Sequence, residues 1–248
     1  MVPLDEKGDW AERQQALASW ALSRWADFPV DANPRLWVFV GSVVLPDGGF
    51  RTGDAKLSFL KGNIVTTVPL PDDVLSLIRA GRHQVNGPTE SPPLVISGVM
   101  KSEADFSTDR GRVRLPAWGL NGSDIKGHIW VLAPEVEAQQ WKPIEPGPPA
   151  PSLTGGGHRS FSSWRETDGR TLHYEFTGGA PEHVEYPDAL VMESDTAAVV
   201  IPIVHDIGPP GPRRARGYKS EVVVHLGAKL GARVLMNLDA SPIPVIER

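Results

Sequence analysis

The chain has 248 residues, of which 40% are hydrophobic and 22% are charged, and this composition predicts packed cores rather than disorder. It contains no cysteine, which excludes disulfides, thiol catalysis and cysteine-bound metals. The formal net charge is −5 and neither half is basic, which argues against a nucleic-acid-binding protein.

The first predicted element is an amphipathic helix at 9–28. Apolar side chains recur there at three- and four-residue steps, and Pro29 ends the pattern. The valine-rich run at 36–45, bounded by prolines, predicts one buried strand.

Short elements follow in the rest of the first half. A helix is expected to begin at Thr52 or Asp54 and to end at Lys61, with Gly62 as its C-cap. A second short helix is expected at 71–80, where proline and two acidic residues suit the first turn. The predicted strands are 63–68, 94–100, 112–118 and 128–132, and a helical turn is expected at 134–141.

The segment 143–157 reads PIEPGPPAPSLTGGG and holds five prolines and four glycines in 15 positions. This composition predicts a linker with an extended, proline-rich first part that spans about 30 Å. Beyond it the sequence has almost no helical pattern. Six strands are predicted there, at 159–164, 171–177, 189–193, 197–205, 219–226 and 233–238.

The predicted fold class is therefore α+β, in two domains. The first is an α+β domain at 1–142 that begins with the amphipathic helix. The Pro/Gly-rich linker at 143–157 leads to a small antiparallel all-β domain at 158–248, either a sandwich or an open barrel.

Two features are candidate contact sites. The helix carries Trp10, Trp20 and Trp25, which form either part of a core or an aromatic face for a partner. The loop GPPGPRRARGYKS gathers four basic residues that can bind an anion or an acidic partner, or stay solvated. These residues are Arg213, Arg214, Arg216 and Lys219.

Motifs of known catalytic chemistry are weak. Ser58 and Lys61 form an S-x-x-K pattern, but about half a chance match is expected from composition, and the large helical domain of such enzymes is missing. The second-half histidines lack metal-ligand spacing, so neither a metal nor a cofactor is expected.

Four stretches resemble sequences that recur in an uncharacterised two-part actinobacterial protein family of unknown function. They are GGFRTGDAKLSFL at 48–60, TDRGRVRLPAWGL at 108–120, GHIWVLAPEV at 127–136 and GYKSEVVVHLGAKLGARVLMN at 217–237. The resemblance implies two parts ending in a β domain. It implies no catalytic residue, cofactor or substrate, and the cysteines common in members that look like envelope proteins are missing here.

The leading hypothesis is a non-enzymatic binding or assembly module. It would contact a protein partner or a second copy through the aromatic helix and the basic loop. The alternative is a hydrolase with a site at the domain junction, which would draw on His173, His183, His205 and Asp206. No leader or membrane-spanning run is visible in the sequence, so a cytoplasmic protein without membrane contact is expected.

Overall fold

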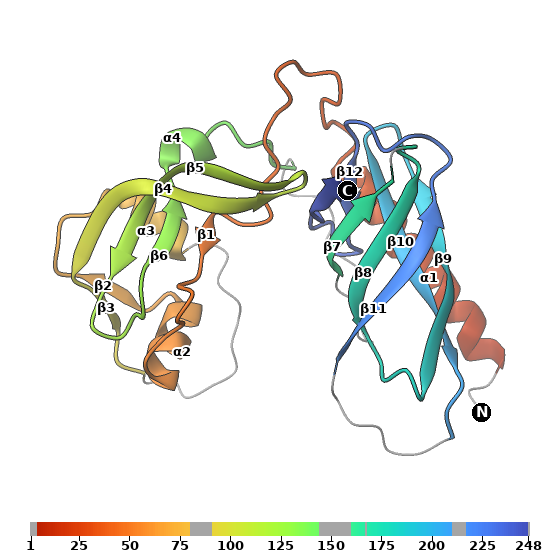
Figure 1. Ribbon diagram of the computed structural model, residues 1–248, viewed down its shortest axis with the longest axis horizontal. Helices are drawn as coiled ribbons and strands as arrows, with labels where there is room; N and C mark the ends of the chain where they lie inside the picture. Colours follow the sequence, from red (N-terminus) through yellow and green to blue (C-terminus); the bar gives the residue numbers. More distant parts are fainter. Residues whose placement is uncertain (1–3, 80–90, 144–159, 167, 210–216, 248) are drawn as a thin grey trace. The chain divides into compact units, whose positions relative to one another are not determined.

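The computed structural model describes residues 4–79, 91–143, 160–166, 168–209 and 217–247. Within these residues the chain forms four helices and thirteen strands, with 18% helix and 42% strand. Most strand pairs are antiparallel, so the predicted α+β class with substantial β content is confirmed. The elements gather into two compact units (Figure 1).

Unit 1 consists of Met1–Val40, Thr108–Gly111 and Trp141–Arg248, whereas unit 2 consists of Gly41–Ser107 and Arg112–Gln140. This division differs from the boundaries predicted at 142 and 158. The N-terminal helix and a hairpin tip group with the C-terminal strands, because their side chains are buried there. The predicted linker lies outside the described residues except for Pro143.

Unit 1 contains one long helix and two sheets, with the strand orders β12-β10-β9 and β11-β8-β7-β13. The pairs β10/β12 and β7/β13 are parallel, and the others are antiparallel. The last strand, β13, has no counterpart among the predicted elements. The bounds are α1 (Leu4–Arg24), β7 (Ser160–Arg165), β8 (Thr171–Gly178), β9 (Val184–Glu193), β10 (Ala197–Asp206), β11 (Tyr218–His225), β12 (Val234–Met236) and β13 (Val245–Glu247).

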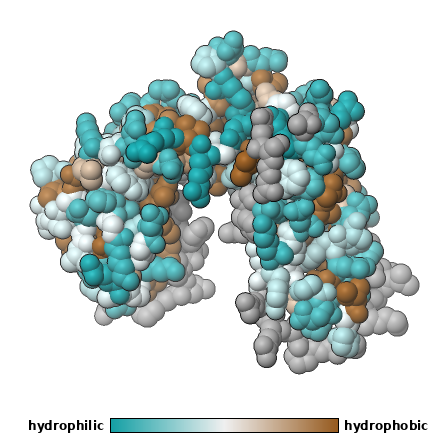
Figure 2. All heavy atoms as spheres, in the orientation of Figure 1, coloured by the Kyte–Doolittle hydropathy of each residue, from teal (hydrophilic) through white to brown (hydrophobic). Residues whose placement is uncertain are grey.

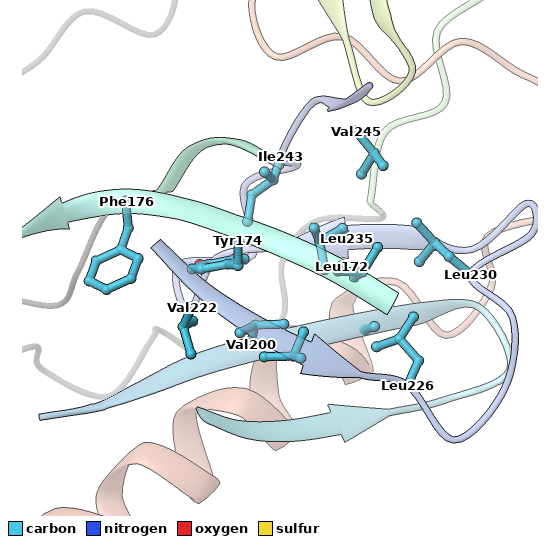
Figure 3. Packing of buried hydrophobic residues seen from close by; sticks show 12 residues of the cluster. Leu172, Tyr174, Phe176, Val200, Val222, Leu226, Leu230, Leu235, Ile243 and Val245 are labelled. Carbon is cyan, nitrogen blue, oxygen red and sulfur yellow. The ribbon is translucent and has the colours of Figure 1, made fainter. Parts of the chain in front are cut away.

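The two sheets of unit 1 pack face to face around an apolar core (Figure 3). Leu172, Tyr174 and Phe176 alternate along β8 and point into it, and Val222 and Val224 do the same from β11. Residues between them on each strand face outward, as expected from the two-residue period of a strand. The strand predicted at 219–226 is therefore present as β11, with Val222 and Val224 buried between exposed residues.

Helix α1 covers the other face of the three-stranded sheet, against β9 and β10 (Figure 1). Ala18, Ala21 and Trp25 share a second core with Val199 and Ile201. The first six residues of strand β10 are thus buried on both faces, which explains why this part of its sequence is a continuous apolar run.

Unit 2 combines a sheet of order β1-β6-β5-β4 with the parallel pair β2/β3 and three short helices. Its core includes Phe59, Ile78, Leu120, Ile129 and Val131, so α2 and α3 cover one face of the sheet. The bounds are β1 (Val43–Val44), α2 (Gly53–Lys61), β2 (Ile64–Thr66), α3 (Asp72–Arg79), β3 (Leu94–Ile96), β4 (Gly98–Thr108), β5 (Gly111–Asn121), β6 (Ile129–Leu132) and α4 (Pro134–Glu137).

The predicted caps of α2 are confirmed. The Thr52 hydroxyl accepts a hydrogen bond from the Ala55 N–H at 3.1 Å, as an N-cap residue does. Gly62 ends the helix with a φ of 69° in the left-handed region, which favours glycine because it has no Cβ.

The single strand predicted at 36–45 is wrong, since only Val43–Val44 forms a strand there. Residues of this apolar run belong to two different cores. Val38 is buried in unit 1, whereas Val43 packs against the core of unit 2. One straight strand cannot supply both, and the chain passes from one unit to the other at residue 40.

Candidate functional site

A hollow of about 400 Å³ lies on unit 2, within the size range of small-ligand sites. We call it the Trp130 hollow. Strands β1, β4, β5 and β6 and the loop after β1 supply its lining. The residues are Val44, Asp47, Glu103, Ala104, Asp105, Ser107, Arg112, Arg114 and Trp130.

The indole ring of Trp130 is held in place by its neighbours. Trp130 pairs with Gly119 on β5 and with Val44 on β1. A Cβ atom at Gly119 would lie 2.6 Å from ring carbon Cζ3 of Trp130, so the indole rests directly on the glycine backbone. The His128 ring lies 5.2 Å away, centroid to centroid. The hollow therefore has a preorganised aromatic wall.

Charged side chains of both signs line the rest of the hollow. Glu103 and Asp105 come from β4, Arg112 and Arg114 from β5, and Asp47 from the loop after β1. The Arg114 Nε–H donates to Glu103 Oε2 at 3.2 Å, and both side chains are more than half exposed. Guanidinium groups supply only donors and carboxylates only acceptors, so the hollow presents both kinds of hydrogen-bonding group.

Among the described residues, no histidine or lysine lines the hollow. The side chains of Glu103 and Asp105 are exposed to solvent.

The visible surface is mainly polar. Figure 2 shows hydrophilic residues over most of it, with hydrophobic residues in several small groups. Scattered apolar residues are normal on a monomer surface. On this face the molecule thus offers polar recognition rather than one large apolar patch.

Most of the predicted basic loop lies outside the described residues. Arg213, Arg214 and Arg216 lie outside the described residues. Lys219 is on β11, where its Nζ lies 2.9 Å from Glu175 Oε1, a carboxylate that is 10% exposed. Lys219 therefore forms an ion pair on the outer face of the sheet.

Two of the three predicted aromatic residues contact the core of unit 1. Trp25 is 2% exposed, and Trp20 is partly buried against the same cluster. The side chain of Trp10 lies outside the described residues. Of the two readings left open by the sequence, the core reading applies to Trp25.

The described histidines of the second half form two groups. His173 and His225 project from neighbouring strands β8 and β11. His205 and His183 lie near the far end of the β9/β10 pair, where the His183 carbonyl accepts the Ile207 N–H. His158 lies outside the described residues. The four described histidines do not converge on one site.

Ser58 is a buried structural residue. Its hydroxyl donates to the Pro92 carbonyl at 2.7 Å and lies 2.9 Å from Ser91 Oγ. A hydroxyl held in this way by backbone is not presented to a substrate, which agrees with the rejection of the S-x-x-K motif.

His173 is the centre of a polar cluster on unit 1. Its Nε2 lies 3.0 Å from Glu166 Oε1 and its Nδ1 lies 2.9 Å from Glu221 Oε1. Its ring stacks on Trp164 with centroids 3.4 Å apart. Ionised carboxylates only accept hydrogen bonds, so both contacts together require the doubly protonated imidazolium.

This cluster predicts a pH-dependent stability. Partial burial lowers the pKa of His173, but the hydrogen bonds and charges of Glu166 and Glu221 outweigh it and raise the pKa above the usual value of about 6.5. The stabilisation is therefore complete below pH ~6.5 and is lost as pH rises through the folded-state pKa. We expect the difference in unfolding free energy between the native chain and His173→Gln, measured in urea from pH 5.5 to 8.5, to shrink as pH increases.

The control is His205→Gln, because His205 Nδ1 lies 3.7 Å from Glu185 Oε1 and both side chains are more than half exposed. That variant should change stability little at any pH. A His173→Gln effect that is constant over the whole range would show that the histidine is not held as the imidazolium.

Among the described residues, no group of three or more histidine, aspartate or glutamate side chains could hold a metal ion. In the same part of the chain, none of the helices has the length and apolar character needed to cross a bilayer.

The comparisons with known proteins return nothing: no family model, curated protein or solved structure matches this chain. The resemblance to uncharacterised actinobacterial proteins thus stays a prediction. The geometry and chemistry of the Trp130 hollow are therefore the basis for proposing a function.

The sequence analysis missed the Trp130 hollow. One signal was present: Glu103 and Asp105 alternate before the stretch STDRG at 107–111, and Arg112 and Arg114 alternate after it. Read as a hairpin, this pattern places opposite charges on adjacent strands. The position of Trp130 over Gly119 depends on the register of β5 with β6, which no local pattern reveals.

Proposed function

We propose that this protein is a non-enzymatic binding module that holds a small polar ligand in the Trp130 hollow. The observation that carries the proposal is a space of about 400 Å³ whose lining includes both the fixed indole of Trp130 and guanidinium donors and carboxylate acceptors. The preorganised indole of Trp130 loses little entropy on binding, which favours affinity at this site.

The partner contacts hypothesised from sequence have less support than ligand binding in the Trp130 hollow. The Trp25 side chain serves the core of unit 1, which leaves less of the aromatic helix for a partner. A contact through Arg213, Arg214 and Arg216 stays a hypothesis, because those residues lie outside the described part of the chain.

The test is a ligand screen read at the indole of Trp130. The ¹⁵N-labelled protein is mixed with small saccharides, phosphates, carboxylates, amines and amino acids, and the Trp130 Nε1–H resonance is assigned with Trp130→Phe. We expect at least one class to shift this resonance. Trp130→Ala should weaken binding by about tenfold, since a stacked aromatic contact contributes roughly 1–1.5 kcal/mol.

Gly119→Ala keeps the indole but moves it, because the new methyl group would collide with the ring. It should weaken the same ligand several-fold, and the matched control Gly53→Ala should not, since a Cβ at Gly53 meets no atom within 4 Å. The proposal fails if no compound shifts the Trp130 resonance, or if Trp130→Ala binds as tightly as the native chain.

A further inference from the structure

The lining of the Trp130 hollow also restricts the class of ligand, if the proposed function holds. Its charged residues are two arginines, Arg112 and Arg114, and three acids, Asp47, Glu103 and Asp105. These charges nearly cancel. A phosphate or other anion would meet three carboxylates, and a cation would meet two guanidinium groups, so neither sign of net charge is favoured.

The hydrogen-bonding groups point to hydroxyls. A hydroxyl group both donates and accepts, so it can satisfy a carboxylate with its hydrogen and a guanidinium with its lone pairs. Arg112 and Asp105 lie on adjacent strands of the β4/β5 hairpin and line the same hollow. Neighbouring hydroxyls on one ring match this mixed arrangement better than a single carboxylate or ammonium group does.

The aromatic wall points to a flat apolar face on the same ligand. Trp130 rests on Gly119 and is flanked by Val44, so its orientation is fixed before the ligand arrives. A rigid, amphipathic indole gives a large contact area at little entropic cost. Saccharide rings carry C–H groups on one face and hydroxyls around the rim, and so satisfy both parts of the hollow.

We infer that the Trp130 hollow binds a neutral, hydroxyl-bearing ring, that is, a saccharide unit. A volume of about 400 Å³ is enough for one or two such rings.

The inference is tested by titrating the whole 248-residue chain with maltose, cellobiose and N,N′-diacetylchitobiose. Inorganic phosphate, choline and phenylalanine stand for an anion, a cation and a zwitterion. We expect at least one saccharide to bind and to shift the Trp130 resonance. Its affinity should change less than twofold between 50 and 500 mM NaCl, because a neutral ligand has no charge for salt to screen.

Two charge-removing variants identify the ligand class independently. Arg112→Gln and Asp105→Asn each remove one charged hydrogen-bonding group, so a neutral saccharide should lose several-fold affinity with both. An anion would be weakened by Arg112→Gln and strengthened by Asp105→Asn, and a cation would show the reverse. Arg51→Gln, an exposed position of unit 2 outside the hollow, should leave binding unchanged.

The outcomes separate the two proposals. Binding of phosphate, choline or phenylalanine at Trp130, without any saccharide, overturns the ligand class and leaves the binding function standing. If neither these six compounds nor the wider screen shifts the Trp130 resonance, the proposed function itself falls.

Discussion

Replacing Trp25 by alanine is expected to lower the free energy of unfolding of unit 1 by about 3–5 kcal/mol, as large aromatic truncations in cores do. Trp25 is 2% exposed, and its ring centroid lies 4.7 Å from that of Trp141 and 5.8 Å from that of Phe28. Its Nε1–H also donates to the Ala240 carbonyl at 3.0 Å. Truncation therefore opens a cavity and removes a buried hydrogen bond.

The measurement is urea denaturation, together with hydrogen exchange of the backbone amides of β9 and β10. These amide protons should exchange with solvent faster in Trp25→Ala than in the native chain. Gln15→Ala, at an exposed position of helix α1, is the control and should stay within about 0.5 kcal/mol of the native chain. If Trp25→Ala kept full stability but lost self-association, the aromatic face would be an interface and not part of the core.

Asp109→Asn is expected to destabilise unit 1 by about 3–5 kcal/mol, the usual cost of removing one partner from a buried ion pair. Asp109 is 1% exposed. Its carboxylate accepts two hydrogen bonds from the guanidinium of Arg35, one to each oxygen, and lies 3.8 Å from Arg110 Nη1. The asparagine fits the space but leaves two partly buried cations without their anion.

Arg110 makes this loss more severe. Burial lowers its pKa to about 10, and the charge of Asp109 opposes that shift while Arg35 adds to it. Arg110 also donates to the Gly231 and Arg233 carbonyls at 2.8 and 2.7 Å. Without Asp109, two like charges would remain close together in a poorly solvated place.

Urea denaturation of Asp109→Asn against Asp31→Asn tests this expectation, because Asp31 is an exposed aspartate of the same unit. Only the Asp109 variant should show the large loss. A change below about 1 kcal/mol would show that the pair behaves as a surface salt bridge.

Local signals in the sequence were enough for some elements. The N-cap Thr52 and the left-handed Gly62 of α2 act within one helical turn, and the alternation of β11 needs only one buried face. Both were predicted correctly because neither depends on a distant part of the chain.

Features that depend on distant residues were not predictable in this way. Val38 and Val43 belong to one apolar run but to different cores. Strand β13 has three residues and exists only because β7 pairs with it. The Trp130 hollow likewise needs the registers of β1, β5 and β6, which are set by the packing of the whole sheet.

In the order of the chain, unit 2 is an insertion into unit 1. The chain leaves unit 1 after Val40 and returns for good at Trp141, and the Trp141 N–H donates to the Trp37 carbonyl at 3.0 Å, so exit and return lie side by side. Insertions are tolerated where two chain ends are adjacent in this way. Between these two points the hairpin tip Thr108–Gly111 also belongs to unit 1, and it supplies the Asp109 carboxylate that neutralises Arg35. Residues 158–248 on their own would lack both the covering helix α1 and this counter-ion. The C-terminal strands are therefore only one part of unit 1, which is assembled from three separate pieces of sequence.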